Sequence, residues 1–104
     1  MESTYADARL RINTAASGDT TLIAAVAGLS TKVYSLRLSV AGAVIVSIKA
    51  GSTVLEVFNF VGAGTMAPLV LRFKPYFQTA TNEALVINLS GAVQCNGAIE
   101  YTVS

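Results

Sequence analysis

Hydrophobic and polar residues alternate with a period of two along most of the chain. At the C-terminus, Val93, Cys95, Ile99, Tyr101 and Val103 share one face and mostly polar residues share the other. This alternation is typical of a β-strand with one buried face. Similar runs occupy residues 9–13, 20–26, 34–40, 44–49, 54–60, 69–74 and 85–90. The pattern therefore predicts about eight short strands.

Glycines stand between several of these runs, at the spacing expected for turns. Gly42, Gly51 and Gly91 each separate two alternating runs, which predicts tight hairpins, and residues 62–65 and 75–83 are predicted as longer loops. The alanine-rich segment 22–28 is the only competitor for a helix, and it is too short to be stable alone. We therefore predict an all-β fold: an antiparallel, jelly-roll-like β-sandwich.

The length of 104 residues fits a single domain, and no low-complexity linker divides it. We predict an N-terminal arm or edge strand over residues 1–12 and one β-sandwich domain over 13–104. Tyr5, Arg9 and Arg11 lie in this polar, slightly basic first segment. Two interpretations stay open: an edge strand protected by charges, or an extended arm whose residues contact a partner.

Several predicted strands carry hydrophobic residues on both faces. Ile45, Val70 and Val86 interrupt the polar faces of their strands. The clearest case is the segment from Val54 to Val61, whose hydrophobic residues are Val54, Leu55, Val57, Phe58, Phe60 and Val61. A sandwich strand with one face in water does not show this pattern, so the chain is predicted to form a homo-oligomer. A trimer is the first expectation, because a jelly roll can pack its sides around a threefold axis. The alternative is that the long loops of the same chain cover both faces.

Four aromatic residues are the candidates for an oligomer interface. Phe58 and Phe60 belong to the segment with two hydrophobic faces, and Tyr76 and Phe77 follow Pro75 in a predicted loop. The loop pair can either close one end of the sandwich or contact a neighbouring subunit.

Charge and hydropathy narrow the functional classes. Only 12% of the residues are charged, about half the usual share, and the net charge is +1. Nothing here predicts binding to nucleic acid. The longest uncharged stretches, 57–71 and 84–99, are interrupted by polar and turn-forming residues, so no membrane-spanning helix is predicted. The first residues do not resemble a signal peptide, and Cys95 is the one cysteine, which favours synthesis in a reducing cytoplasm.

Residues suited to catalysis are scarce. The chain has no histidine, which removes the usual general base and the usual metal ligand. Its six carboxylates show no calcium-loop spacing, and a distant pair such as Glu56 and Glu100 is better explained as solvated strand residues. Cys95 falls on a hydrophobic face, where a thiol is usually inert. We therefore expect no catalytic, cofactor-binding or metal-binding residues, and no enzyme.

Four segments carry a resemblance to a known group of proteins: residues 13–28, 32–36, 42–46 and 83–90. Together they resemble small virion proteins of tailed bacteriophages, especially the jelly-roll decoration, or cement, proteins of their capsids. The chain departs from that pattern at residues 29–31, where a turn of the Gly-Lys-Lys type is expected. The resemblance implies a structural protein on the capsid surface of the virion, made in the host cytoplasm. It further implies a β-domain, often trimeric, and an N-terminal arm that reaches along the shell, but it carries over no individual functional residues. If the first segment is such an arm, Tyr5, Arg9 and Arg11 are its candidate contacts with the major capsid protein.

A second hypothesis is a receptor- or glycan-binding domain of a phage tail fibre or spike. Glycan sites usually offer exposed aromatic residues beside polar ones. The candidates are Tyr5, Tyr34, Tyr76 and Tyr101, and the chain has no tryptophan, which weighs against this alternative.

Overall fold

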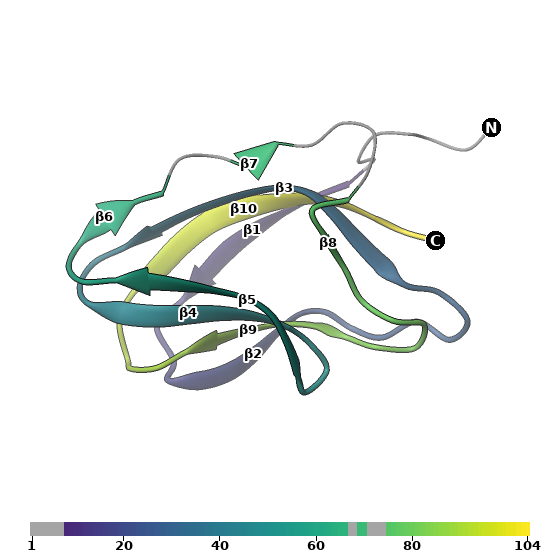
Figure 1. Ribbon diagram of the computed structural model, residues 1–104, viewed down its shortest axis with the longest axis horizontal. Coiled ribbons are helices and arrows are strands. Elements are labelled where there is room, and N and C mark those ends of the chain that lie inside the picture. Colours follow the sequence, from purple (N-terminus) through teal and green to yellow (C-terminus); the bar gives the residue numbers. More distant parts are fainter. Residues whose placement is uncertain (1–7, 67–68, 71–74) are drawn as a thin grey trace.

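The computed structural model describes residues 8–66, 69–70 and 75–104. The described residues form two antiparallel sheets that pack face to face and contain no helix (Figure 1). The strands are β1 (Ala8–Thr14), β2 (Gly18–Ile23), β3 (Thr31–Val40), β4 (Val44–Ala50), β5 (Thr53–Phe60), β6 (Gly64–Thr65), β7 (Leu69–Val70), β8 (Phe77–Gln78), β9 (Leu85–Leu89) and β10 (Cys95–Val103). The prediction of an all-β antiparallel sandwich is confirmed.

Each sheet mixes strands from distant parts of the chain. The first sheet has the order β1-β10-β3-β6, and the short strands β7 and β8 also pair with β3. The second sheet has the order β2-β9-β4-β5. The first and last long strands of the chain are therefore neighbours, and β1 and β5 lie at edges of their sheets.

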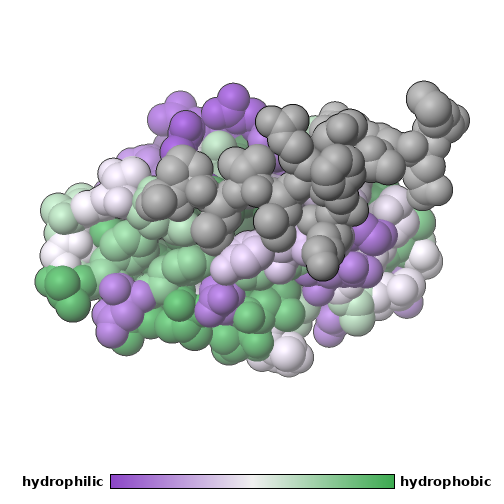
Figure 2. All heavy atoms as spheres, turned by 45° about the horizontal axis from the view of Figure 1, so that its top comes forward, coloured by the Kyte–Doolittle hydropathy of each residue, from purple (hydrophilic) through white to green (hydrophobic). Residues whose placement is uncertain are grey.

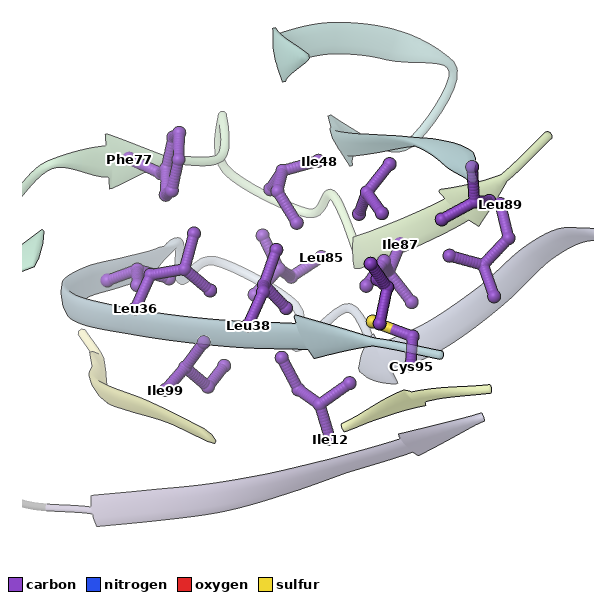
Figure 3. Close-up of a cluster of buried hydrophobic side chains, with 14 residues drawn as sticks. Ile12, Leu36, Leu38, Ile48, Phe77, Leu85, Ile87, Leu89, Cys95 and Ile99 are labelled. Atoms are coloured by element: carbon purple, nitrogen blue, oxygen red, sulfur yellow. The ribbon is translucent and has the colours of Figure 1, made fainter. Parts of the chain in front are cut away.

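The core lies between the two sheets and is built from the inward-facing positions of the alternating runs. In Figure 3, side chains of β1, β3 and β10 meet those of β4 and β9. Ile12, Leu38, Ile87 and Cys95 have no exposed surface. Complete burial of a leucine or isoleucine side chain contributes about 1.5–3 kcal/mol, so this layer supplies the main drive for folding.

Three β-bulges interrupt the strict alternation. Tyr34 is an extra residue in β3, because Ser35 pairs with Glu100 whereas Val33 already pairs with Tyr101. The register also shifts at two further places, where Leu22 in β2 and Leu55 in β5 are the extra residues. A bulge reverses the side to which the following residues point. Val33, which the period-two pattern assigns to the opposite face from Leu36, is therefore buried.

The bulge at Leu55 accounts for part of the two-faced pattern in β5. Leu55, Phe58 and Phe60 pack against the core from one side of the strand. Val54 and Val57 lie on the other side and are exposed. The hydrophobic residues of this segment are thus divided between the core and the surface.

Only one of the three predicted hairpins is present. Gly51 has a φ of 59° and begins the turn that joins β4 to β5 within one sheet. The segments around Gly42 and Gly91 instead carry the chain from one sheet to the other, from β3 to β4 and from β9 to β10. The hairpin prediction was wrong there because a glycine between two strands marks a change of direction and does not reveal whether the strands pair.

The two predicted long loops contain short strands. Gly64 and Thr65 pair with Val40 and Ser39 as β6, and β8 pairs with the beginning of β3. Thr79, which follows β8, is buried, and its Oγ1 accepts a hydrogen bond of 2.8 Å from the Thr31 amide. Within the described residues, no helix is long and hydrophobic enough to cross a membrane.

Candidate functional site

Three arginines surround a hollow on the outer face of the first sheet. The hollow has a volume of roughly 520 Å³ and is lined by Arg9, Arg11, Arg37, Ser39, Asn96, Gly97 and Ala98. We call these seven residues the arginine hollow. They come from β1, β10 and β3, which are adjacent strands of one sheet.

The strand register explains why the arginines meet. Arg11 pairs with Ala98 in β10, and Ala98 pairs with Arg37 in β3, so two arginines flank one small residue in a single row. Neighbouring strands lie about 4.8 Å apart, which places the two arginine Cα atoms on the order of 10 Å from each other. Arg9 lies two residues before Arg11 on the same face, about 7 Å along the strand.

Polar side chains next to the hollow are already engaged with one another. In the row of Arg9, the Ser35 hydroxyl donates a hydrogen bond of 2.8 Å to the Glu100 carboxylate. On the other side, the Gln94 amide donates to the side-chain oxygens of Asn13 and Asn96. By contrast, no described residue accepts a hydrogen bond from the three guanidinium groups, and no described carboxylate lies within 4 Å of them.

The opposite side of the molecule carries an exposed hydrophobic surface. Four residues of β4, β5 and the segment after β5 form it: Ile45, Val54, Val57 and Val61, with 42%, 53%, 49% and 93% of their surface exposed. Figure 2 shows hydrophobic residues gathered on the side where β5 lies. We call these four residues the valine face.

The valine face borders an unpaired strand edge. Among the described residues, β5 pairs with β4 on one side and with no strand on the other. A long, hydrophobic edge strand offers a row of free backbone N–H and C=O groups beside hydrophobic side chains, and proteins that stay monomeric usually protect such an edge. This edge is therefore suited to contact with another chain.

The valine face shares the outer surface of the second sheet with a polar cluster, because Val57 pairs with Ser47, Ser47 with Asn88, and Asn88 with Asp19. The Lys49 ammonium lies 3.1 Å from the Asp19 carboxylate, and the Asn88 amide donates a hydrogen bond of 2.7 Å to the same carboxylate. The bonds from Asn88 and Lys49 lower the pKa of Asp19 below its usual value of 3.8. This cluster links β2, β9 and β4 across the sheet, so we interpret it as a structural contact.

The predicted interface aromatics occupy different environments. Phe58 and Phe60 are half-buried and pack against the core of their own chain, and Phe77 is buried in that core. Tyr76 is exposed, and its ring lies edge-on to Phe77 with 4.5 Å between the ring centres. Of the four predicted interface aromatics, Tyr76 alone is exposed. The other large hydrophobic residues exposed in the described part of the chain are the four of the valine face, Val26 and Leu29.

The predicted arm residues fall partly within the described chain. Arg9 and Arg11 lie on edge strand β1, whose residues pair with β10 from Ala8 to Thr14. Tyr5 lies outside the described residues. Arg37 was not singled out by sequence reasoning; its only signal was a polar position in the alternating run 34–40, and the strand order alone brings it to Arg11.

The single cysteine is buried, and burial raises the pKa of the Cys95 thiol. The structure describes no group of three or more histidine, cysteine, aspartate or glutamate residues placed to hold a metal ion.

No protein-family model matches the chain, and no curated protein is significantly similar to it.

Proposed function

We propose that the chain is a structural virion protein that decorates and stabilises a phage capsid as a homo-oligomer. The observation that carries this proposal is the valine face beside the free edge of β5. Closed association of copies removes such a surface from water, at about 25 cal/mol for each Å² of hydrophobic area. A trimer remains the first expectation.

The proposal assigns the two sides of the sandwich to different partners. The valine face contacts other copies, and the side with β1 and the arginine hollow contacts the major capsid protein. Many identical weak contacts on a shell give strong overall attachment without a tight individual site, which suits a protein that works by binding and has no enzymatic role.

We also propose that the sandwich is a jelly roll. Its support is the way consecutive strands alternate between the sheets: β1 to β2, β3 to β4 and β9 to β10 each cross from one sheet to the other. Two Greek keys wound together produce crossings of this kind.

The test is rebinding to shells from which the protein is absent. Purified protein is mixed with intact and expanded shells, which are then pelleted and melted by scanning calorimetry. We expect co-sedimentation and a higher shell melting temperature. If the protein binds neither form of the shell, the proposal fails, and binding to host cells or to a glycan array instead would support the tail-fibre alternative.

Two truncations separate the arm from the strand. Deletion of residues 1–7 leaves β1 complete, whereas deletion of 1–11 also removes the residues that pair with β10 from Ala98 to Tyr101. An arm role predicts that the shorter deletion already abolishes shell binding while the β-sheet circular dichroism is retained. If only the longer deletion abolishes binding, the strand and not the arm is responsible.

A further inference from the structure

The arginine hollow concentrates positive charge in a chain that has little charge elsewhere. The sequence contains four arginines and three lysines, and three of the four arginines line this one hollow. Lys49 is paired with Asp19, and the Lys32 ammonium donates hydrogen bonds to Ser104. The arginines of the hollow have no such partner among the described residues. By the strand spacings, the three arginine positions lie within about 12 Å of one another. Their like charges repel, and an anion placed between them relieves that repulsion.

The floor of the hollow leaves room for a ligand to approach the sheet closely. Ala98 and Gly97 lie on β10, between the two arginine-bearing strands, so no large side chain of β10 fills the space there. Ser39 and Asn96 add neutral polar groups at one end. An arginine guanidinium forms paired, parallel hydrogen bonds with a carboxylate, and three of them can hold more than one carboxylate at a time.

The spacing of the arginines favours an extended acidic segment of a protein. Arg9 and Arg11 lie two residues apart on one strand, so their Cα atoms are separated by about 7 Å. Side chains at alternate positions of an extended peptide have the same separation. The described residues that line the hollow include no aromatic side chain on which a base could stack. Three arginines also contact fewer phosphates than a protein that binds a nucleic acid backbone usually does. Charge, size and spacing therefore agree on carboxylates at alternate positions of an extended chain.

We propose that the arginine hollow binds an extended acidic segment of the partner protein, with Arg9, Arg11 and Arg37 each contacting a carboxylate. The inference rests on the proposed function for the identity of the partner, the capsid protein, and it names the chemistry of that contact. Binding of a peptide is measured without any shell, so failure of this proposal and failure of shell decoration are separate results.

The probe is a fluorescent eight-residue peptide in which glutamate and serine alternate, followed by fluorescence anisotropy at low salt. The reference probe has glutamine at every glutamate position. We expect the folded protein to bind the acidic probe and not the reference, with affinity that falls as salt is raised. Arg11→Gln and Arg37→Gln are each expected to weaken binding about tenfold, since hydrogen bonds to charged groups contribute at this level.

Lys49→Gln is the matched control, because it removes the same charge from the other sheet. We expect it to change the affinity less than twofold. Circular dichroism of each variant verifies the fold. Because the arginines are exposed, their substitution is not expected to disturb it. The proposal is overturned if the acidic probe does not bind at millimolar protein, or if Lys49→Gln weakens binding as much as the arginine variants do. It is also overturned if inorganic phosphate or a single-stranded oligonucleotide competes more strongly than the unlabelled acidic peptide.

Discussion

Gly97 is the position at which a single added methyl group is expected to disturb the fold most. It lies in the middle of β10, paired with Ile12 on one side and with Leu38 on the other. A Cβ at this position overlaps the backbone carbonyl oxygen of Arg37, and the Arg37 carbonyl carbon is 2.9 Å away. Because the obstacle is the backbone of the neighbouring strand, a side-chain rotation cannot relieve the overlap.

The cost of Gly97→Ala follows from this geometry. Overpacking in a well-packed interior typically costs about 1–3 kcal/mol, and a backbone obstacle places this variant at the upper end. The reduced entropy of the unfolded chain offsets about 0.4–1 kcal/mol of that cost. We therefore expect a net loss of about 2 kcal/mol, which corresponds to a fall in Tm of roughly 8–16 °C for a domain of this size.

Gly91→Ala is the matched control for this measurement. A Cβ at Gly91 meets no atom within 4 Å, and its backbone does not require a positive φ. Thermal unfolding followed by circular dichroism is expected to show an unchanged or slightly raised Tm for Gly91→Ala and a clear fall for Gly97→Ala. Equal Tm values for the two variants refute the close approach of β10 and β3 at this point.

Three further predictions concern the core and the charged cluster. Leu38→Ala removes a fully buried side chain and is expected to cost about 2–5 kcal/mol in chemical denaturation, with an unchanged midpoint contradicting its place in the core. Cys95→Ser is expected to cost about 1–3 kcal/mol, and the native thiol is expected to react with Ellman's reagent only on unfolding; rapid reaction of the folded protein contradicts its burial. The bonds from Asn88 and Lys49 hold the pKa of Asp19 in the folded protein below 3.8, so they stabilise the fold above about pH 4 and this contribution is lost as the pH falls below that value. Asp19→Asn is accordingly expected to lower the Tm at pH 6 and to differ less from the original protein at pH 2.5; an equal difference at both pH values contradicts the linkage.

The sequence pattern predicted the sandwich because burial on one face of a strand imposes a period of two. Leu36 and Leu38 in β3 and Ile87 in β9 are buried as their alternation indicates. The bulges at Tyr34 and Leu55 could not be predicted in this way, because an extra residue becomes visible only when the partner strand is known. The same limit applied to the glycine turns, since pairing depends on strand order.

The candidate surfaces depended on strand order even more strongly. Arg9 and Arg11 were noticeable as a basic pair, but Arg37 is far from them in the sequence and reaches them only because β10 lies between β1 and β3. For Phe77 the sequence left two alternatives open, closure of one end of the sandwich or contact with a neighbouring subunit, and its pairing with Val33 places it in the core.

The proposed function depends above all on association of copies through the valine face. Sedimentation velocity of the purified protein, beside Val57→Lys, tests it most directly. About half of the Val57 surface is exposed, and burying that half in an interface contributes about 1 kcal/mol in each copy. An unpaired lysine at the same position opposes association, because its charge would have to leave water. We predict a particle of about three times 10.8 kDa for the original protein and a folded 10.8 kDa monomer for the variant. A 10.8 kDa monomer for the original protein at tens of micromolar, or an unchanged oligomer for Val57→Lys, would contradict the proposal.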